Sequence, residues 1–210
     1  MAEKVALIDY GAGNLHSVHN ALKAAGADAV EVTADLAVLR RCERIVLPGV
    51  GSFRSCAEGL RNCTGLIAAL EDRVLGERVP FLGICVGMQL LATRGYEHGE
   101  TPGLDWIGGD VLPVERTDEA IKVPHMGWND VALLPHARQH PVLREGEAYF
   151  LHSYHFVADD GQDVAAMTDH GGGIVAAVSR DNIAGVQFHP EKSQRYGIAM
   201  LRRFLDWQPA

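Results

Sequence analysis

Ten residues near the middle of the chain, from Val79 to Met88, constrain its fold more than any other segment. An apolar run typical of a β-strand leads into Cys85, with Gly83 and Gly87 on either side, and an apolar helical pattern follows. Gly-x-Cys-x-Gly has the form of a nucleophile elbow, a strand-to-helix turn so tight that its flanking side chains must be small. The pattern predicts Cys85 at the carboxyl end of a strand, where a helix amino terminus favours a thiolate and backbone N–H groups stabilise an oxyanion. Such a cysteine indicates acyl-transfer chemistry.

The length and composition fit one globular domain. With 210 residues the chain can bury a sizeable core, and we expect residues 1–210 to form a single domain. A formal net charge of −8 argues against a nucleic-acid or anionic-membrane surface as partner. Gly, Pro or a charged residue interrupts every apolar run before it reaches the length of a membrane span. Met1–Lys4 lead directly into a strand pattern, so we expect no signal peptide.

The cysteines and histidines do not form a metal-binding pattern. The four cysteines show no Cys-x-x-Cys spacing, so we expect free thiols, a reducing cytoplasmic location and no metal; they are Cys42, Cys56, Cys63 and Cys85. The cysteines other than Cys85 are interpreted as core or helix-face residues. His125, His152 and His155 lack metal-ligand spacing and are interpreted as packing or hydrogen-bonding residues. No cofactor is expected.

The first half of the chain alternates strand and helix patterns. Strands are predicted over residues 4–9, 29–33, 44–47 and 80–84, and helices over 15–25, 52–62 and 66–75, with Asn14 and Gly26 as caps of the first helix. This alternation predicts an α/β fold with a central, mostly parallel sheet and helices on both faces. Functional groups then belong beyond the carboxyl ends of the strands.

The second half has a different pattern. Short alternating strands are predicted over residues 110–114, 131–134, 148–155, 164–168, 174–179 and 183–187. We interpret them as an antiparallel extension of the same sheet. A last helix is predicted near 193–207, with Ile198, Leu201 and Leu205 on one face.

A base for Cys85 is predicted at the end of the last strand. His189 follows that strand, and a histidine can both activate a thiol and protonate a leaving amine. Glu191 lies two residues further on, and Pro190 restricts the backbone between them. A carboxylate in that position can orient the imidazole. We therefore predict that Cys85, His189 and Glu191 meet in the folded chain.

These motifs carry a resemblance to a known family. The chain resembles the class I (triad) glutamine amidotransferases and, within them, the glutaminase subunits of imidazole glycerol phosphate synthase, in order and over essentially its whole length. The matching segments are Gly83–Gln89, Gln187–Ser193, Asp9–Asn14, Pro48–Phe53, His125–Asn129 and Tyr149–Tyr154. Val86 stands where leucine is common in the family, a mild departure because that position contributes its backbone N–H. The resemblance implies a flavodoxin-like fold.

The resemblance also implies roles for individual residues. Cys85 would attack the amide carbon of glutamine to form a γ-glutamyl thioester, while His189 moves the proton to ammonia and Glu191 orients the imidazole. The oxyanion hole would use Val86, Val50 after a peptide reorientation, and Gly51. Glycines on both sides of Val50 would give its peptide room to turn. Substrate-binding residues would be Gln89, Ser153 and Tyr154.

By the same resemblance, the partner is a (β/α)₈-barrel cyclase subunit that receives ammonia and makes imidazole glycerol phosphate and AICAR in histidine biosynthesis. The heterodimer interface and ammonia gate would include Asn14, Trp128, Tyr149 and Lys192. A buried tryptophan is a common centre of binding energy at interfaces, which suits Trp128.

Three alternatives remain open at this point. Another triad glutaminase is disfavoured by Pro48-Gly49-Val50-Gly51, where other pathway members usually have different runs. A stand-alone cysteine hydrolase of the related flavodoxin-like group is disfavoured by His189-Pro190-Glu191. A non-catalytic binding subunit is disfavoured by the intact Cys85, His189 and Glu191. A dinucleotide site after the first strand is excluded because His16 stands where a glycine is needed.

Overall fold

A computed structural model describes residues 4–116 and 121–209, and Met1–Glu3, on which the expected absence of a signal peptide depends, lie outside the described residues. In chain order its elements are β1 (Lys4–Ile8), α1 (Leu15–Ala25), β2 (Ala29–Thr33), α2 (Leu36–Leu39), β3 (Arg44–Gly49), α3 (Phe53–Asn62), α4 (Leu66–Glu71), β4 (Phe81–Cys85), α5 (Val86–Gln89), β5 (Arg94–Gly95), β6 (Thr101–Pro102), β7 (Gly109–Pro113), β8 (His125–Leu133), β9 (Gly146–His152), β10 (Tyr154–Ala158), β11 (Val164–Asp169), β12 (Gly173–Arg180), β13 (Ile183–Val186) and α6 (Gln194–Asp206).

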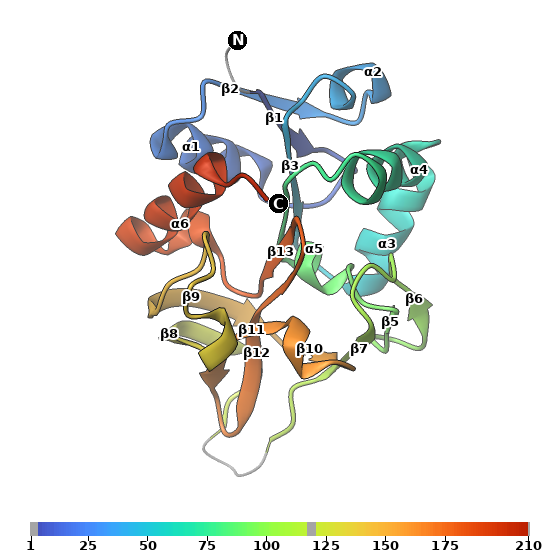
Figure 1. Cartoon of the computed structure of the whole chain (residues 1–210). Coiled ribbons are helices and arrows are strands. Elements are labelled where there is room, and N and C mark those ends of the chain that lie inside the picture. Colours follow the sequence, from blue (N-terminus) through green and yellow to red (C-terminus); the bar gives the residue numbers. More distant parts are fainter. Residues whose placement is uncertain (1–3, 117–120, 210) are drawn as a thin grey trace.

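The largest sheet has nine strands in the order β2-β1-β3-β4-β13-β12-β11-β8-β9. The strands from β2 to β13 are parallel to their neighbours, and those from β13 to β9 pair antiparallel. Helices α1 and α6 cover one face of the parallel part, and α3 and α4 cover the other (Figure 1). The predicted α/β fold, with helices on both faces and an antiparallel extension, is confirmed.

The interpretation of the second half was wrong in two places. β13 pairs parallel with β4, Ile84 opposite Val186, and therefore belongs to the parallel part of the sheet. β7 and β10 lie in a second sheet of four strands, in the order β10-β7-β5-β6. The predicted strand 148–155 is broken at Ser153, between the end of β9 and the start of β10. The Ser153 carbonyl accepts a hydrogen bond from the Val114 N–H at 2.8 Å, and β10 continues from there in the second sheet.

Local sequence signals explain where the helices begin and end. The Asn14 side chain accepts the Ser17 N–H at the start of α1, and Gly26 ends this helix in the left-handed region at φ 109°. The Ser52 side chain accepts the Ser55 N–H at the start of α3. The predicted helix 66–75 consists of α4 followed by a π-helical turn over Asp72–Gly76. The two ends of α1 and the start of α3 therefore agree with the capping residues in the sequence.

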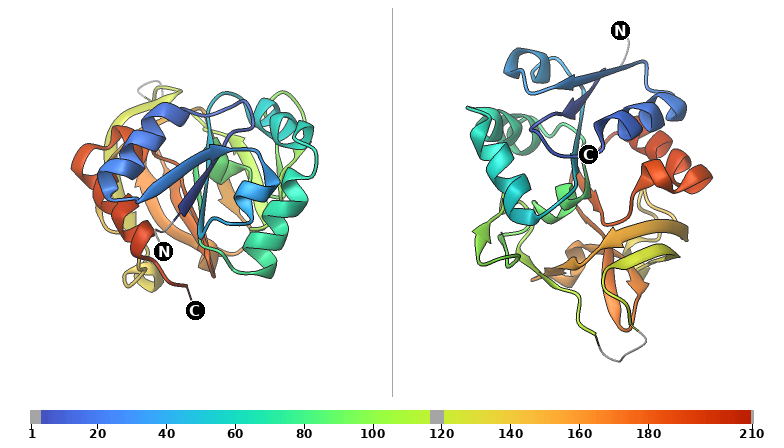
Figure 2. Two further views of the ribbon diagram at one scale, coloured as in Figure 1. Left: turned by 90° about the horizontal axis from the view of Figure 1, so that it is seen from above. Right: turned by 180° about the vertical axis from the view of Figure 1, so that it is seen from behind.

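The core fills both sides of the parallel strands. Residues of β1, β3 and β4 are almost all buried, and so are the apolar residues of helices α1, α3 and α6. These helices flank the sheet on its two sides (Figure 2). Across the described ranges 4–116 and 121–209, no helix combines the length and apolar character needed to cross a bilayer. The packing leaves the carboxyl ends of β3, β4 and β13 side by side, and the candidate site lies there.

Candidate active site

Cys85 occupies a strained turn between β4 and α5. Its φ is +55°, a left-handed value that non-glycine residues adopt at a cost, and its side chain is 3% exposed. A Cβ on Gly83 would lie 2.6 Å from the Gly87 carbonyl oxygen, and one on Gly87 would lie 1.9 Å from that of Leu47. The elbow therefore needs glycine at both positions for backbone contact.

Helix α5 is shorter than the apolar pattern after Cys85 suggests. It covers four residues, Val86–Gln89. The carbonyls of Leu90 and Leu91, which a longer helix would use, instead accept N–H groups of Leu104 and Trp106 at 2.7 and 3.0 Å. The Cys85 sulfur therefore lies beside the N–H groups of a single helical turn.

His189 and Glu191 lie beside this elbow, although they are distant from it in sequence. Since β13 pairs with β4, the segment after β13 emerges next to Cys85. His189 Nδ1 and Glu191 Oε1 are 2.8 Å apart, and both side chains are almost fully buried. Burial opposes charge on the His189 ring, but hydrogen bonding to Cys85 and Glu191 and the charges of both outweigh it and raise the pKa of His189 to about 9. This environment favours an imidazolium beside the sulfur.

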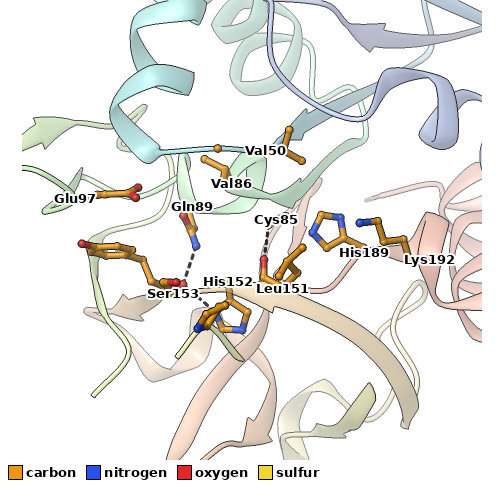
Figure 3. A pocket seen from close by; sticks show the side chains of 13 residues that line it. Val50, Cys85, Val86, Gln89, Glu97, Leu151, His152, Ser153, His189 and Lys192 are labelled. Carbon is orange, nitrogen blue, oxygen red and sulfur yellow. Dashed lines mark hydrogen bonds between the residues drawn. The ribbon is translucent and has the colours of Figure 1, made fainter. Parts of the chain in front are cut away.

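Cys85 and His189 line a cavity of about 290 Å³. Its walls come from β4–α5, the β3–α3 loop, the β9–β10 junction and the segment after β13 (Figure 3). The lining residues are Val50, Gly51, Cys85, Val86, Gln89, Glu97, Pro124, Leu151, His152, Ser153, Tyr154, His189 and Lys192. Glu191 lies behind His189, outside this lining set. The cavity thus brings together the residues predicted for nucleophile, base, oxyanion hole and substrate.

Two hydrogen bonds fix the loop that follows β3, one before and one after the Gly49–Val50 peptide. Tyr10 Oη donates to the Pro48 carbonyl at 2.7 Å, and Cys56 Sγ donates to the Val50 carbonyl at 3.4 Å. Gly49 lies between these bonds, where a Cβ would be 2.7 Å from the Gly87 nitrogen, and Gly51 has φ +99°. Val50 itself is 42% exposed at the cavity. The Gly49–Val50 peptide therefore lies between two fixed carbonyls.

Gln89 connects the walls of the cavity. Its side chain is 3% exposed, and its Nε2 donates to the Tyr154 carbonyl at 2.9 Å and to Gln187 Oε1 at 3.0 Å. Ser153 and Tyr154 line the cavity where β9 gives way to β10. This wall is polar and firmly bonded, which suits recognition of a polar ligand.

Three of the four predicted interface residues form a row that ends at the cavity rim, where Lys192 lies. Trp128 is 47% exposed and meets Tyr149 edge to face at 6.2 Å, and the Lys192 ammonium lies 5.7 Å from the Tyr149 ring centre. Lys192 also lines the cavity beside His189 (Figure 3). Asn14 lies outside the cavity lining and caps α1.

Sequence reasoning missed two residues of this site. Glu97 lines the cavity as a carboxylate and accepts the Phe53 N–H at 2.7 Å, and no motif around it indicated such a place. Gln187 is fully buried, and its Nε2 is 3.7 Å from the Cys85 sulfur. Its position two residues before His189 was visible in the sequence, but its place beside Cys85 follows only from the pairing of β13 with β4.

The other cysteines, together with His125 and His152, take part in packing or hydrogen bonding. All four cysteines are free thiols, with Cys42 and Cys56 buried and Cys63 partly buried. His125 Nδ1 and His152 Nε2 are 3.0 Å apart, and His125 stacks on Phe150. No group of three or more His, Cys, Asp or Glu side chains is arranged to hold a metal within residues 4–116 and 121–209.

A cysteine elbow beside a buried histidine–carboxylate pair, on a parallel sheet of this order, defines a class of protein. The family model described as glutamine amidotransferase class-I matches residues 6–207, and the chain belongs to this family. Similar curated relatives are each named imidazole glycerol phosphate synthase subunit HisH. The one from Zymomonas mobilis is 56% identical over 98% of this chain and 96% of its own length, and the one from Caulobacter vibrioides is 50% identical over 99% and 100%. Within its class, the chain therefore belongs to the HisH family.

Solved structures show the same fold at low identity. A crystal structure described as glutamine amidotransferase has a TM-score of 0.74 at 19% identity, covering 96% of this chain and 97% of its own. A structure described as PurLQS, from Thermotoga maritima, has a TM-score of 0.70 at 18% identity, covering 98% of this chain and 99% of its own. At such identities the likeness concerns the fold alone.

Proposed function

We propose that this chain is the glutaminase subunit of imidazole glycerol phosphate synthase, hydrolysing glutamine to glutamate and ammonia for histidine biosynthesis. The observation that carries this proposal is the approach of Cys85 and His189 at one cavity, with Glu191 2.8 Å from the ring. The HisH relatives, 44–56% identical, support the assignment to that synthase. Residues 1–210 would act as one domain in the cytoplasm, in keeping with a family match over 6–207 and four free thiols.

The proposed reaction begins with the Cys85 thiolate. Its sulfur attacks the side-chain amide carbon of glutamine, and the tetrahedral adduct collapses as the carbon–nitrogen bond breaks. The His189 imidazolium gives its proton to the departing nitrogen, which leaves as ammonia, and a γ-glutamyl thioester remains. Neutral His189 then takes a proton from water as the water attacks the thioester, which releases glutamate and restores the thiolate. Glu191 keeps Nε2 of the imidazole directed at the sulfur by its bond to Nδ1.

The oxyanion of each adduct would be held by backbone N–H groups. Val86 is the first residue of α5, so its N–H is free of an intrahelical partner at the position next to the nucleophile. The second donor would be the Val50 N–H after rotation of the Gly49–Val50 peptide. A missing oxyanion donor costs roughly 10²–10³ in rate, so a peptide turned away would keep the subunit nearly silent until its partner docks.

The substrate's amino-acid end would lie against the polar wall formed by Gln89, Ser153 and Tyr154. Glu97 faces the same cavity, and a carboxylate there would attract the α-ammonium group of glutamine. The side-chain amide would then extend towards Cys85. This orientation uses the charge of one end of the substrate to position the other.

The partner would be a (β/α)₈-barrel cyclase subunit in a heterodimer. The exposed Trp128 packs edge to face on the partly buried Tyr149, next to Lys192, which lines the cavity. Asn14 would add a contact from the start of α1. Docking over this rim would let ammonia pass into the barrel, where it would remain unprotonated and take part in forming imidazole glycerol phosphate and AICAR. Lys192, next to His189, would gate that exit.

The test compares Cys85→Ala with Cys63→Ala, which removes a free thiol outside the cavity. Each variant is assayed for glutamate release and for synthesis from added ammonium, alone and with the purified cyclase subunit. We expect Cys85→Ala to abolish glutamine hydrolysis and keep ammonia-dependent synthesis, while Cys63→Ala keeps both. Hydrolysis by Cys85→Ala would exclude Cys85 as nucleophile, and full activity of the parent without a partner would contradict the Val50 gate.

A further inference from the structure

We propose that Gln187 is a positioning residue that holds the Cys85 sulfur in its reactive place and favours its anionic form. The proposal rests on the proposed function, because it concerns the nucleophile of that reaction. Gln187 Nε2 is 3.7 Å from Cys85 Sγ, and the Gln187 side chain is fully buried. At that distance and burial, the amide N–H is a second polar contact of the sulfur, besides His189, from the segment that follows β13.

The orientation of the Gln187 amide is fixed by its neighbour. Gln89 Nε2 donates both to the Tyr154 carbonyl and to Gln187 Oε1, at 2.9 and 3.0 Å. Because Tyr154 offers only a carbonyl there, Gln89 must present its NH₂ group, and Gln187 must accept with its oxygen. The NH₂ group of Gln187 is then directed at the sulfur. The chain from Tyr154 through Gln89 to Gln187 thus ends in a donor.

The contacts of the sulfur distinguish its two charge states. The Cys85 thiol can donate to the Leu151 carbonyl at 3.9 Å, a contact that only the protonated form makes. The Gln187 N–H can donate to either form but interacts more strongly with the anion. The Leu151 carbonyl therefore favours the thiol form of Cys85, and the Gln187 amide favours the thiolate. If the Gln187 amide is removed, the Leu151 carbonyl remains and disfavours the thiolate.

Gln187 does not titrate, unlike the ionisable side chains around the sulfur. The ionisable side chains that face Cys85 or line its cavity come from every surrounding element. They are His189, Glu191 and Lys192 after β13, Tyr10 after β1, Cys56 on α3, Glu97 after β5, His152 on β9 and Tyr154 on β10. The contribution of Gln187 stays constant across the pH range in which these groups change charge.

The experiment measures alkylation of Cys85 by iodoacetamide as a function of pH, with the labelled peptide identified by mass spectrometry. Gln187→Leu removes the donor, and Gln187→Glu keeps the side-chain shape and the acceptor for Gln89 but turns an oxygen to the sulfur. We expect Gln187→Leu to lower the alkylation rate at pH 7 about fivefold and to move the pH profile towards higher pH. Gln187→Glu should have an effect at least as large.

The matched control is Asn182→Leu, at the other end of β13. Asn182 is also a buried amide, and its Nδ2 donates to the carbonyls of Val74 and Val79 at 2.9 and 2.8 Å, away from Cys85. We expect this variant to lose stability and keep the parent's pH profile of alkylation. A parental profile in both Gln187 variants, or an equal shift in Asn182→Leu, would overturn the proposal. Alkylation of Cys85 does not require the enzyme to turn over glutamine. A failure of the glutaminase assignment would therefore be seen in a different measurement, as the absence of glutamate release by the parent protein.

Discussion

The contact between α5 and β3 leads to a sharp prediction for Gly87→Ala. A Cβ at Gly87 would lie 1.9 Å from the Leu47 carbonyl oxygen and 2.9 Å from its carbon, and both are backbone atoms that no side-chain rotation can move. The end of β3 and the elbow must therefore separate by about 1 Å or more. Overpacking of this kind costs about 3 kcal/mol. The same shift carries the Val50 loop away from Cys85, and a displacement of about 1 Å at a reacting centre costs about 10²-fold in rate.

The assay is urea unfolding followed by circular dichroism, together with glutaminase activity in the presence of the partner subunit. Gly76→Ala is the matched control, because a Cβ there has no atom within 4 Å and the residue has no positive φ. We expect this control to change the free energy of unfolding by about 0.5 kcal/mol or less and to keep parental activity. A Gly87→Ala protein as stable and active as Gly76→Ala would refute the reasoning.

Three further predictions concern pH and the partner. The raised pKa of His189 should make glutaminase activity fall above about pH 9, where the imidazolium deprotonates, and a pH–rate profile measures this. The stability that the charged ring contributes is complete below pH 6.5 and is lost as the pH rises from there through about 9, which urea unfolding midpoints measure. Burial lowers the pKa of His125 to about 4 and of His152 to about 3. The stability that these two neutral rings contribute should therefore be complete above pH 6.5, and the free energy of unfolding should be lower by about 2 kcal/mol or more at pH 5. Urea unfolding at pH 7.5 and 5 would show this. Trp128→Ala should weaken binding of the cyclase subunit about 30-fold by calorimetry, whereas Leu75→Ala, also an exposed apolar residue, should leave it unchanged.

Much of the parallel half of the fold follows from local patterns. Asn14, Gly26 and Ser52 set helix ends through side-chain caps or a left-handed turn, interactions within a few residues that the sequence displays directly. The antiparallel half depends on pairings between distant strands. Nothing in the apolar pattern of 183–187 tells whether it pairs parallel with β4 or extends the sheet at its edge, and the break at Ser153 arises from a bond to Val114.

The same division applies to the site. The spacing of Gly83, Cys85 and Gly87 predicts a tight turn, because backbone approach there depends on adjacent residues. Glu97 enters the cavity from the loop between two short strands, and tertiary pairing alone determines its place. Gln187 became recognisable only once β13 was placed beside β4, since its distance to the sulfur depends on that register.

The pairing of β4 with β13 has a consequence for how such proteins diversify. Ile84 lies opposite Val186, so the nucleophile and the base come at and just after the ends of two adjacent strands, and this pairing holds them near each other. That intervening chain supplies β8 and β9, which carry Trp128 and Tyr149. Changes to the surface around Trp128 and Tyr149 can therefore alter what this face contacts without separating Cys85 from His189.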